Sequence, residues 1–473
     1  MSSVSPMAPK VAIIGAGSSG LAAAQVFSRH GMEPVVLEQE SQSGGVWCYQ
    51  TKQQANTKKT KPMYRGLRTN LPKEIMQFRE FPWKMPLDRS FVTHQQVQEY
   101  LLEYQTQFGL DKFIRYGCQV SQLQVLKDSK SALSPTTSSE EDWPQIRLAW
   151  KHNNNNEEES EIFDAVCICN GHYSKPAFPP LQGLHEYYQG RILHSVEYDN
   201  PADFVGQRVL CIGGRASGSD LAREIGAHAQ HVYLSDSTCT LSDGTPETLD
   251  NITWVPLTVG IQEDGTAQFQ NCNTLFPTVD CIIFCTGYDY DFPFLNNNND
   301  NNDDEPVQCV PGERRVMPLY EQLWHARYPT VSFLGIPHSV VPFPEVEFQA
   351  EAVHAQYTVH NNQLPPLEER LQAAERDAVS GGAKGPQNGR IQDTHYLGAQ
   401  QWDYCRQMAK LAGVYDQSVE DYIATNQMIY DHSTNNRKGA FPAGPDDYRE
   451  VRYTRKESGA GFTFDAKDTV GTA

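Results

Sequence analysis

VAIIGAGSSG, residues 11–20, joins a run of four apolar residues to a glycine-rich loop. The apolar run predicts a short buried strand, and residues 21–29 predict a helix that Gly31 ends. A second strand is expected over residues 34–37. The stretch therefore predicts a β-α-β unit whose glycine loop lies between the first strand and the helix.

Each position of this loop has a physical role in binding a dinucleotide. Gly15 permits the tight turn, Gly17 lets a pyrophosphate approach the backbone, and Gly20 lets the helix pack on the strand. The amides of Ser18 and Ser19 begin the helix, where they face the phosphates. These residues are candidates for binding the first dinucleotide.

An acidic residue follows the second predicted strand at the spacing that the motif requires. Glu38 lies 18 residues beyond Gly20, where its carboxylate can bind ribose hydroxyls. The alternative is a glycine loop that serves packing only. The strand, the helix and Glu38 together favour dinucleotide binding.

A second unit repeats this order farther along the chain. Residues 208–212 predict a strand, residues 219–227 a helix, and residues 231–234 another strand. The loop between the first two reads GGRASG, residues 213–218. The chain is therefore expected to bind two dinucleotides.

The second loop departs from the fingerprint at one position. Gly213 and Gly218 match its first and third glycines, whereas Arg215 stands at the second, and Ser217 is the fifth residue of the loop. A degenerate loop that binds nothing is the alternative. Recurrence in the same strand-loop-helix setting favours binding by Gly213, Arg215, Ser217 and Gly218.

Two later apolar runs each end in a sharp glycine turn. Residues 165–169 precede Asn170-Gly171, and residues 279–285 precede Thr286-Gly287. Because the second unit lies between these turns, we predict an α/β fold in which the second Rossmann-like domain is inserted into the first. The predicted domains are listed by residue number: 1–175 with 285–473, a discontinuous FAD domain, and 176–284, a nicotinamide domain.

Composition limits the classes of partner. The chain has 473 residues and a formal net charge of −19, which disfavours nucleic acid and anionic lipid. No apolar segment has the length of a signal peptide core or of a transmembrane helix, which needs roughly 20 apolar residues. The eleven cysteines show no paired metal-binding spacing, so we expect no metal site and a reduced, cytoplasmic protein. The composition is compatible with a homo-oligomer and does not determine the oligomeric state.

Cysteine spacing also bears on where electrons from a nicotinamide and a flavin would go. Cys281 and Cys285 on one strand would have Cα atoms ~13 Å apart, beyond the ~7 Å limit for a disulfide. Cys167 and Cys169 are expected to be small buried residues. Without a redox dithiol, molecular oxygen becomes the natural acceptor.

The segment Tyr188-Gln189-Gly190-Arg191-Ile192-Leu193-His194-Ser195-Val196-Glu197-Tyr198 resembles the identifying motif of flavin-containing monooxygenases. That motif is Phe-x-Gly-x-x-x-His-x-x-x-Tyr/Phe, and Tyr188 replaces its leading Phe. Further matches extend the resemblance over roughly residues 9–430 and are listed here: GGVW at 44–47, LRTNLP at 67–72, CTGY at 285–288 and SFLG at 332–335. We expect His194 to be a structural hydrogen bonder near the hinge between the domains.

The resemblance implies an enzyme that uses FAD, NADPH and O2 on a small nucleophilic substrate. NADPH would reduce FAD, oxygen would add at the flavin C4a, and a soft nitrogen or sulfur atom would take one oxygen atom. Asn70 matches the asparagine that lies at the flavin, and it is the candidate catalytic residue. The remaining FAD candidates implied by the resemblance are Gly45, Val46, Trp47, Val120 and Gln349.

Several alternatives stay open at this point. Asn70 could instead cap a loop before Leu71-Pro72, and Trp47 could be a core aromatic. A Baeyer–Villiger or N-hydroxylating relative is the alternative enzyme, and the former would be expected to have Trp at Tyr198. A nucleotide-binding flavoprotein without turnover is the non-enzymatic alternative.

The coenzyme motif gives conflicting indications. Many members of the family have an arginine after the second strand of this unit to meet the 2′-phosphate of NADPH. This chain has Asp236 there, which suits the free ribose hydroxyls of NADH, while Arg215 could supply a cation from the loop. The resemblance favours NADPH, with reduced discrimination.

Three polar tracts and two helical patterns complete the sequence predictions. Residues 127–142, 153–161 and 296–305 are expected to be loop expansions. Residues 396–412 and 419–430 predict helices that cap the first domain.

Overall fold

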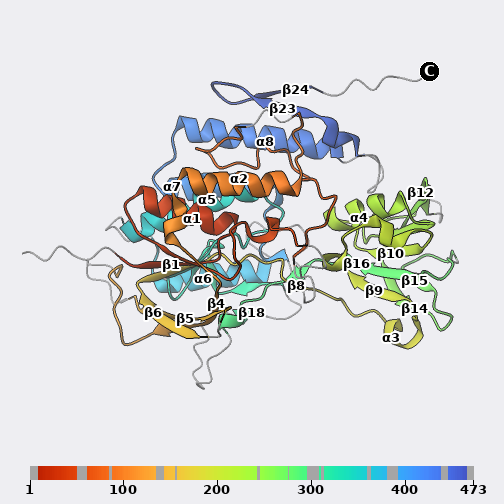
Figure 1. The fold of residues 1–473 in the computed structure, drawn as a ribbon, viewed down its shortest axis with the longest axis horizontal. Helices are drawn as coiled ribbons and strands as arrows, with labels where there is room; N and C mark the ends of the chain where they lie inside the picture. The colour runs from red at the N-terminus through yellow and green to blue at the C-terminus, as the bar shows by residue number, and fades with distance from the viewer. Residues whose placement is uncertain are drawn as a thin grey trace, which may run out of the picture.

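The computed structural model describes residues 9–50, 61–84, 88–134, 143–154, 157–241, 246–274, 276–295, 308–309, 314–358, 364–380, 393–437 and 446–465. Figure 1 shows two bodies side by side, each built around its own sheet. We call them the first body and the second body. Helix α4 (Ala216–Gly226) belongs to the second body, and the longer helices belong to the first.

The first body is built on a seven-stranded sheet. Its strands, in spatial order, are β20 (Leu319–Tyr320), β21 (Trp324–His325), β22 (Val331–Phe333), β7 (Ala165–Ile168), β1 (Val11–Ile14), β2 (Val35–Glu38) and β3 (Ile114–Tyr116). The five from β22 to β3 run parallel. Every residue of β1 and β7 is buried, as expected for central parallel strands covered on both faces.

Helices cover one face of this sheet. They are α1 (Ser18–Arg29), α2 (His94–Gln107), α5 (Pro342–Thr358), α7 (Gln401–Leu411) and α8 (Gln417–Arg437). A further helix, α6 (Leu367–Ser380), packs beside β20. The last two helices that the sequence predicted correspond to α7 and α8.

An antiparallel sheet of three strands covers the other face. It consists of β4 (Cys118–Leu126), β5 (Gln145–His152) and β6 (Glu158–Phe163). The prediction of a loop over residues 153–161 was therefore wrong for residues 158–161. Polar residues are tolerated there because β6 is an edge strand whose side chains are mostly exposed while its backbone pairs with β5. The tract 296–305 lies outside the described residues, as does the tract 127–142 beyond residue 134.

The second body is built on a six-stranded sheet. Its order is β12 (Glu247–Leu249), β13 (Ile252–Val255), β11 (His231–Ser235), β10 (Arg208–Ile212), β16 (Cys281–Phe284) and β9 (Arg191–His194). All pairs are parallel except the edge pair β12–β13. These strands fall between β7 and β20 in the sequence, so the second sheet is inserted into the first body. The predicted α/β fold with two Rossmann-like units is confirmed.

The two chain crossings between the bodies lie next to each other. Strand β8 (Lys175–Pro176) leads toward the second body, and β17 (Tyr288–Asp289) returns from it, and the two pair antiparallel. His194, which is fully buried, places its Nε2 atom 3.0 Å from the carbonyl oxygen of Gly287 beside this pair. The histidine of the identifying motif thus contacts backbone at the crossing.

The described chain also contains shorter elements. They are α3 (Leu184–Tyr187) and the strand pairs β14 (Thr258–Ile261) with β15 (Ala267–Phe269), β18 (Gln308–Cys309) with β19 (Val316–Met317), and β23 (Arg452–Arg455) with β24 (Phe462–Asp465). The last pair lies over α8 in Figure 1. Among the described helices, none is long and apolar enough to cross a bilayer.

Candidate functional site

The first glycine loop forms a tight turn before an uncapped helix. Gly15 has a φ of +97°, and a Cβ atom there would lie 2.8 Å from the carbonyl oxygen of Cys169. A Cβ atom on Gly20 would lie 1.9 Å from the carbonyl oxygen of Gly15. Within the described chain, no side chain caps the helix at Gly17, so the first-turn amides at Ser18 and beyond can face an anion.

Two neighbouring segments close around this loop. The Oε2 atom of Glu38 accepts a hydrogen bond from the Ala16 amide at 2.6 Å, and burial raises the pKa of this carboxyl. The Gly44 amide donates to the carbonyl of Ala16 at 2.9 Å, and a Cβ atom on Gly45 would lie 3.0 Å from the Cα of Gly17. The glycine loop, the helix start and Glu38 together form a cradle that fits a dinucleotide such as FAD.

The other residues predicted for the first dinucleotide lie around this cradle. Val46 and Trp47 belong to a short 3₁₀ turn, Gly45–Trp47, and Trp47 packs partly buried against the core under α1. Val120 on β4 shares a core cluster with Leu37, which precedes Glu38.

Gln349 reaches the cradle only through other groups. It is fully buried on α5 and accepts the Gly335 amide at 2.8 Å, while its amide nitrogen donates to Tyr404 at 3.0 Å. A Cβ atom on Gly335 would lie 2.9 Å from the hydroxyl of Ser19. Gln349 therefore positions the backbone beside the loop.

The second loop repeats the backbone of the first. Gly213 has a φ of +109°, and a Cβ atom on Gly218 would lie 1.7 Å from the carbonyl oxygen of Gly213. Arg215 begins α4 with φ −74° and ψ −167°, against −76° and −170° for Gly17. Because any residue can adopt this extended conformation, arginine at the second fingerprint position does not distort the loop. This geometry disfavours the degenerate-loop alternative.

Asp236 stands at the position that Glu38 has in the first body. The Gly213 amide donates to the carbonyl of Ser235 at 2.8 Å, as the Gly15 amide does to that of Leu37 at 2.8 Å. Asp236 follows Ser235, and its carboxylate is so close that a Cβ atom on Gly214 would lie 2.1 Å from Oδ2. An acidic group therefore borders the ribose end of the second loop.

The side chains of Arg215 and Ser217 are exposed at the start of α4. Burial lowers the pKa of His338 to about 4, and the positive charge of Arg215 is the next largest cause. His338 follows β22 in the first body. The Arg215 guanidinium is thus close enough to the first body to affect a side chain there.

Asn70 lies where the cores of the two bodies meet. Leu71 packs against the core under α1, and Leu67 packs against the core of the second sheet. Thr69 is held by its amide, which donates to the Val92 carbonyl at 2.8 Å. The half-buried Asn70 side chain makes no hydrogen bond with the described residues, which disfavours the loop-capping alternative.

Sequence reasoning missed one residue of this region, Arg449. Its Nε atom donates to the carbonyl oxygen of Thr69 at 3.0 Å, and its side chain is only 5% exposed. It lies beyond the last family motif, in a polar tail that gave no sequence signal. Only the tertiary structure brings it beside Asn70.

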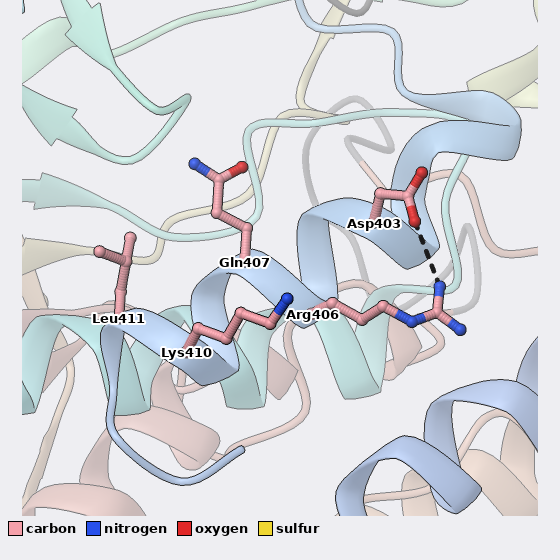
Figure 2. Close-up of a pocket in the computed structure, with 5 residues that line it drawn as sticks. All are labelled: Asp403, Arg406, Gln407, Lys410 and Leu411. Carbon is pink, nitrogen blue, oxygen red and sulfur yellow. Dashed lines mark hydrogen bonds and ion pairs between the residues drawn. The ribbon is translucent and has the colours of Figure 1, made fainter. Parts of the chain in front are cut away.

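A surface hollow on α7 has no part in this site. Figure 2 shows its five lining residues along this one helix, with Asp403 paired to Arg406. The hollow has a volume of about 420 Å³ and is open to solvent. Among the residues whose side chains are described, ten cysteines are free and no cluster of metal-ligating side chains occurs.

The two bodies thus have the fold of a two-domain α/β protein in which a glycine loop precedes an uncapped helix start in each body, and Asn70 lies between the two cores. A family model described as flavin-binding monooxygenase-like matches residues 8–244. The chain is 34% identical to flavin-containing monooxygenase FMO GS-OX-like 2 of Arabidopsis thaliana, over 73% of each chain. It is 31% identical to FMO GS-OX-like 4 of the same plant, over 85% of this chain and 87% of that protein. The chain therefore belongs to the flavin-containing monooxygenase family.

Solved structures agree with this family. S-allyl-L-cysteine S-oxygenase from Allium sativum superimposes with a TM-score of 0.78 at 28% identity, covering 93% of this chain and 95% of that one. Cyclohexanone monooxygenase shares the fold at 13% identity, with a TM-score of 0.56 over 86% of this chain and 98% of that one. The chain is thus a flavin-dependent monooxygenase by family.

Proposed function

We propose that this monooxygenase binds FAD at loop 15–20 and a reduced nicotinamide dinucleotide at loop 213–218. One atom of O2 enters a small substrate, and the other leaves as water with two electrons from the coenzyme. The observation that best supports this proposal is the position of Asn70 between the two cores, each of which ends in an uncapped helix start.

A soft sulfur atom is the substrate group that we propose first, and a soft nitrogen atom the second. A solved relative that is 28% identical over 93% of this chain is an S-allyl-L-cysteine S-oxygenase. Such nucleophiles attack an activated oxygen atom without help from a protein base. No protein nucleophile or metal is needed for this chemistry.

The residues of this chain supply binding and positioning. Gly15, Gly17 and Glu38 would hold the adenosine and pyrophosphate half of FAD, which supplies the redox chemistry and oxygen activation when bound. The Asn70 amide can both donate and accept hydrogen bonds at the meeting point of the two cradles. The apolar packing of Leu67 and Leu71 on either side helps to keep water from that point.

The identity of the coenzyme is a separate question. The family resemblance implies NADPH, whose 2′-phosphate needs a cation at the ribose end of the loop. The chain contains no lysine or arginine between Arg223 and Arg314, a segment that includes β11, Asp236 and the following turn. Arg215 is in the loop itself, where its charge acts on His338 of the first body.

We therefore propose that the enzyme accepts both coenzymes and uses NADH at least as well as NADPH. Asp236 would bind the two free ribose hydroxyls of NADH, as Glu38 would bind those of FAD. Arg215 would contact the pyrophosphate, which the two coenzymes share.

Three further properties are part of the proposal. The nicotinamide domain comprises residues 176–284, in accord with the pairing of β8 and β17 at the crossings. A cytoplasmic location is supported by the free cysteines among the described residues. We also propose a homo-oligomer, which analytical sedimentation of the FAD-loaded protein would test.

The experiment for the proposed function is a substrate panel with purified, FAD-loaded protein. A thioether, a tertiary amine and a cyclic ketone are each incubated with NADH or NADPH in air, and products are identified by mass spectrometry. Sulfoxide formation supports the proposal, whereas a lactone as the main product would establish the Baeyer–Villiger alternative. If neither coenzyme reduces the flavin under anaerobic conditions, the protein is a nucleotide-binding flavoprotein without turnover.

A further inference from the structure

Three segments that are distant in sequence meet at the guanidinium of Arg449. Its Nε atom donates to the Thr69 carbonyl at 3.0 Å, its Nη2 atom to Asp220 at 2.8 Å, and its Nη1 atom to Asp446 at 2.8 Å. The Arg449 side chain is 5% exposed and that of Asp220 is 15% exposed. One side chain from the C-terminal segment therefore connects the first body to the second.

Two of the three contacted residues, Asp220 and Thr69, lie next to the proposed chemistry. Asp220 is on the first turns of α4, which begins at the second loop. Thr69 directly precedes Asn70. A displacement of α4 when coenzyme binds at its start can thus shift the backbone next to Asn70 through the guanidinium of Arg449.

Charges around Arg449 are balanced by a second arginine. Arg223 donates to Asp446 at 2.6 Å and to Asp220 at 3.2 Å. Arg68 lies 4.0 Å from Asp446 and 3.4 Å from Glu450, so the network holds three cations and three carboxylates. No hydrogen bond joins Arg223 to the backbone of residues 66–70 in the described chain. Of Arg449 and Arg223, Arg449 is therefore the one that donates to the backbone of the Asn70 segment, while Asp446 lies 4.0 Å from the guanidinium of Arg68 in the same segment.

The planar fork of arginine is required for this arrangement. Its three nitrogen atoms point to three partners in fixed directions, whereas a lysine ammonium is a point charge on a flexible stem. Charge-assisted hydrogen bonds that are largely buried are also stronger than those in solvent. Lysine would keep the charge balance and lose the simultaneous contacts.

We infer that Arg449 is a positioning residue that couples coenzyme binding at α4 to the placement of Asn70. The inference rests on the proposed function for its catalytic consequence. The coupling itself needs only that the coenzyme binds at the second loop, and it has a readout that needs no turnover.

The first experiment measures amide hydrogen exchange of residues 66–72 in FAD-loaded protein, with and without NADH. In the parent protein, NADH is expected to slow exchange in this segment. In Arg449→Lys this slowing is expected to disappear. Asp220→Asn weakens the same ion pair from the side of α4, and the slowing is expected to disappear in this variant too. Equal slowing by NADH in the parent and in both variants would overturn the inference.

Arg406→Met is the matched control. Arg406 forms a bidentate ion pair with Glu420, at 2.8 and 2.9 Å, in the C-terminal part of the first body and away from α4. It should leave the NADH effect on residues 66–72 unchanged. Loss of the effect in this control as well would attribute it to general destabilisation and contradict a specific role for Arg449.

The second experiment measures product formed per coenzyme oxidised. Arg449→Lys should retain FAD and lower this ratio by up to about a hundredfold, the cost of misplacing a reacting group by roughly 1 Å, with peroxide making up the difference. A lower thermal midpoint with an unchanged ratio of product to oxidised coenzyme would show that Arg449 only stabilises the fold, and would overturn its positioning role. If the parent oxygenates none of the panel, the proposed function fails while the exchange result still decides the coupling.

Discussion

The two glycine loops have the same backbone and different side chains at one position. Gly17 and Arg215 share φ and ψ to within a few degrees, yet the first position has no side chain and the second carries an exposed cation. Glu38 and Asp236 occupy matching places after the second strand. The outer glycines are thus needed by the backbone, because a Cβ atom there would collide with carbonyl oxygens. The second position accepts a side chain, which can then contribute to the choice of ligand.

Gly17→Val is expected to have the largest effect on this comparison. The valine side chain would occupy the space that the loop leaves for a pyrophosphate, so the purified protein should hold no flavin, and all oxygenation should be lost with the flavin. The measurement is the ratio of flavin to protein absorbance after purification. Gly17→Ala is the control for folding, because its Cβ atom would lie 3.5 Å from the Cα of Gly45, an ordinary contact. A fully flavin-loaded Gly17→Val protein would refute the role of this loop.

Asn70→Ala tests the segment between the two loops. Loss of one positioned hydrogen-bonding group in an active site costs roughly 10²- to 10³-fold in turnover, so sulfoxide formation should fall by that factor. FAD content should stay at the parent level because Asn70 lies away from the adenosine cradle. Peroxide release should continue. Oxygenation at the parent rate would show that Asn70 is only a loop residue.

Asp236→Ala tests the proposed equivalence with Glu38. Loss of charge-assisted bonds to two ribose hydroxyls, at about 1.5 to 3 kcal/mol, predicts a kcat/KM for NADH lower by about ten- to a hundredfold. NADPH should be used no worse, since a repulsion is removed. Asp264→Ala, on an exposed turn of the second body, is the control. Equal losses in kcat/KM for both coenzymes would show that Asp236 does not discriminate between NADH and NADPH.

Arg215→Ala is expected to have the smallest effect. If Arg215 contacts the pyrophosphate, KM should rise about tenfold for NADH and NADPH alike, the lower end of a charge-assisted hydrogen bond. Steady-state kinetics with both coenzymes measures the two factors. A loss confined to NADPH would instead place the 2′-phosphate on Arg215 and restore the expectation drawn from the resemblance.

The sequence was sufficient for the parts of the site that depend on local backbone. The glycine loops, Glu38 and the strands that flank them are local in sequence, and β1 and β10 have the predicted bounds. Strand β6 was missed because an exposed edge strand needs no apolar pattern. The contacts of Arg449 could not be predicted, since they join residues separated by more than 200 positions and follow no periodic pattern.

The most direct test of the account follows isotopically labelled dioxygen into a thioether during turnover with NADH. The account predicts a sulfoxide that carries one labelled oxygen atom, formed in step with coenzyme oxidation in the parent and uncoupled from it in Asn70→Ala. A sulfoxide whose oxygen comes from water, or labelled product at the parent rate in Asn70→Ala, would contradict it.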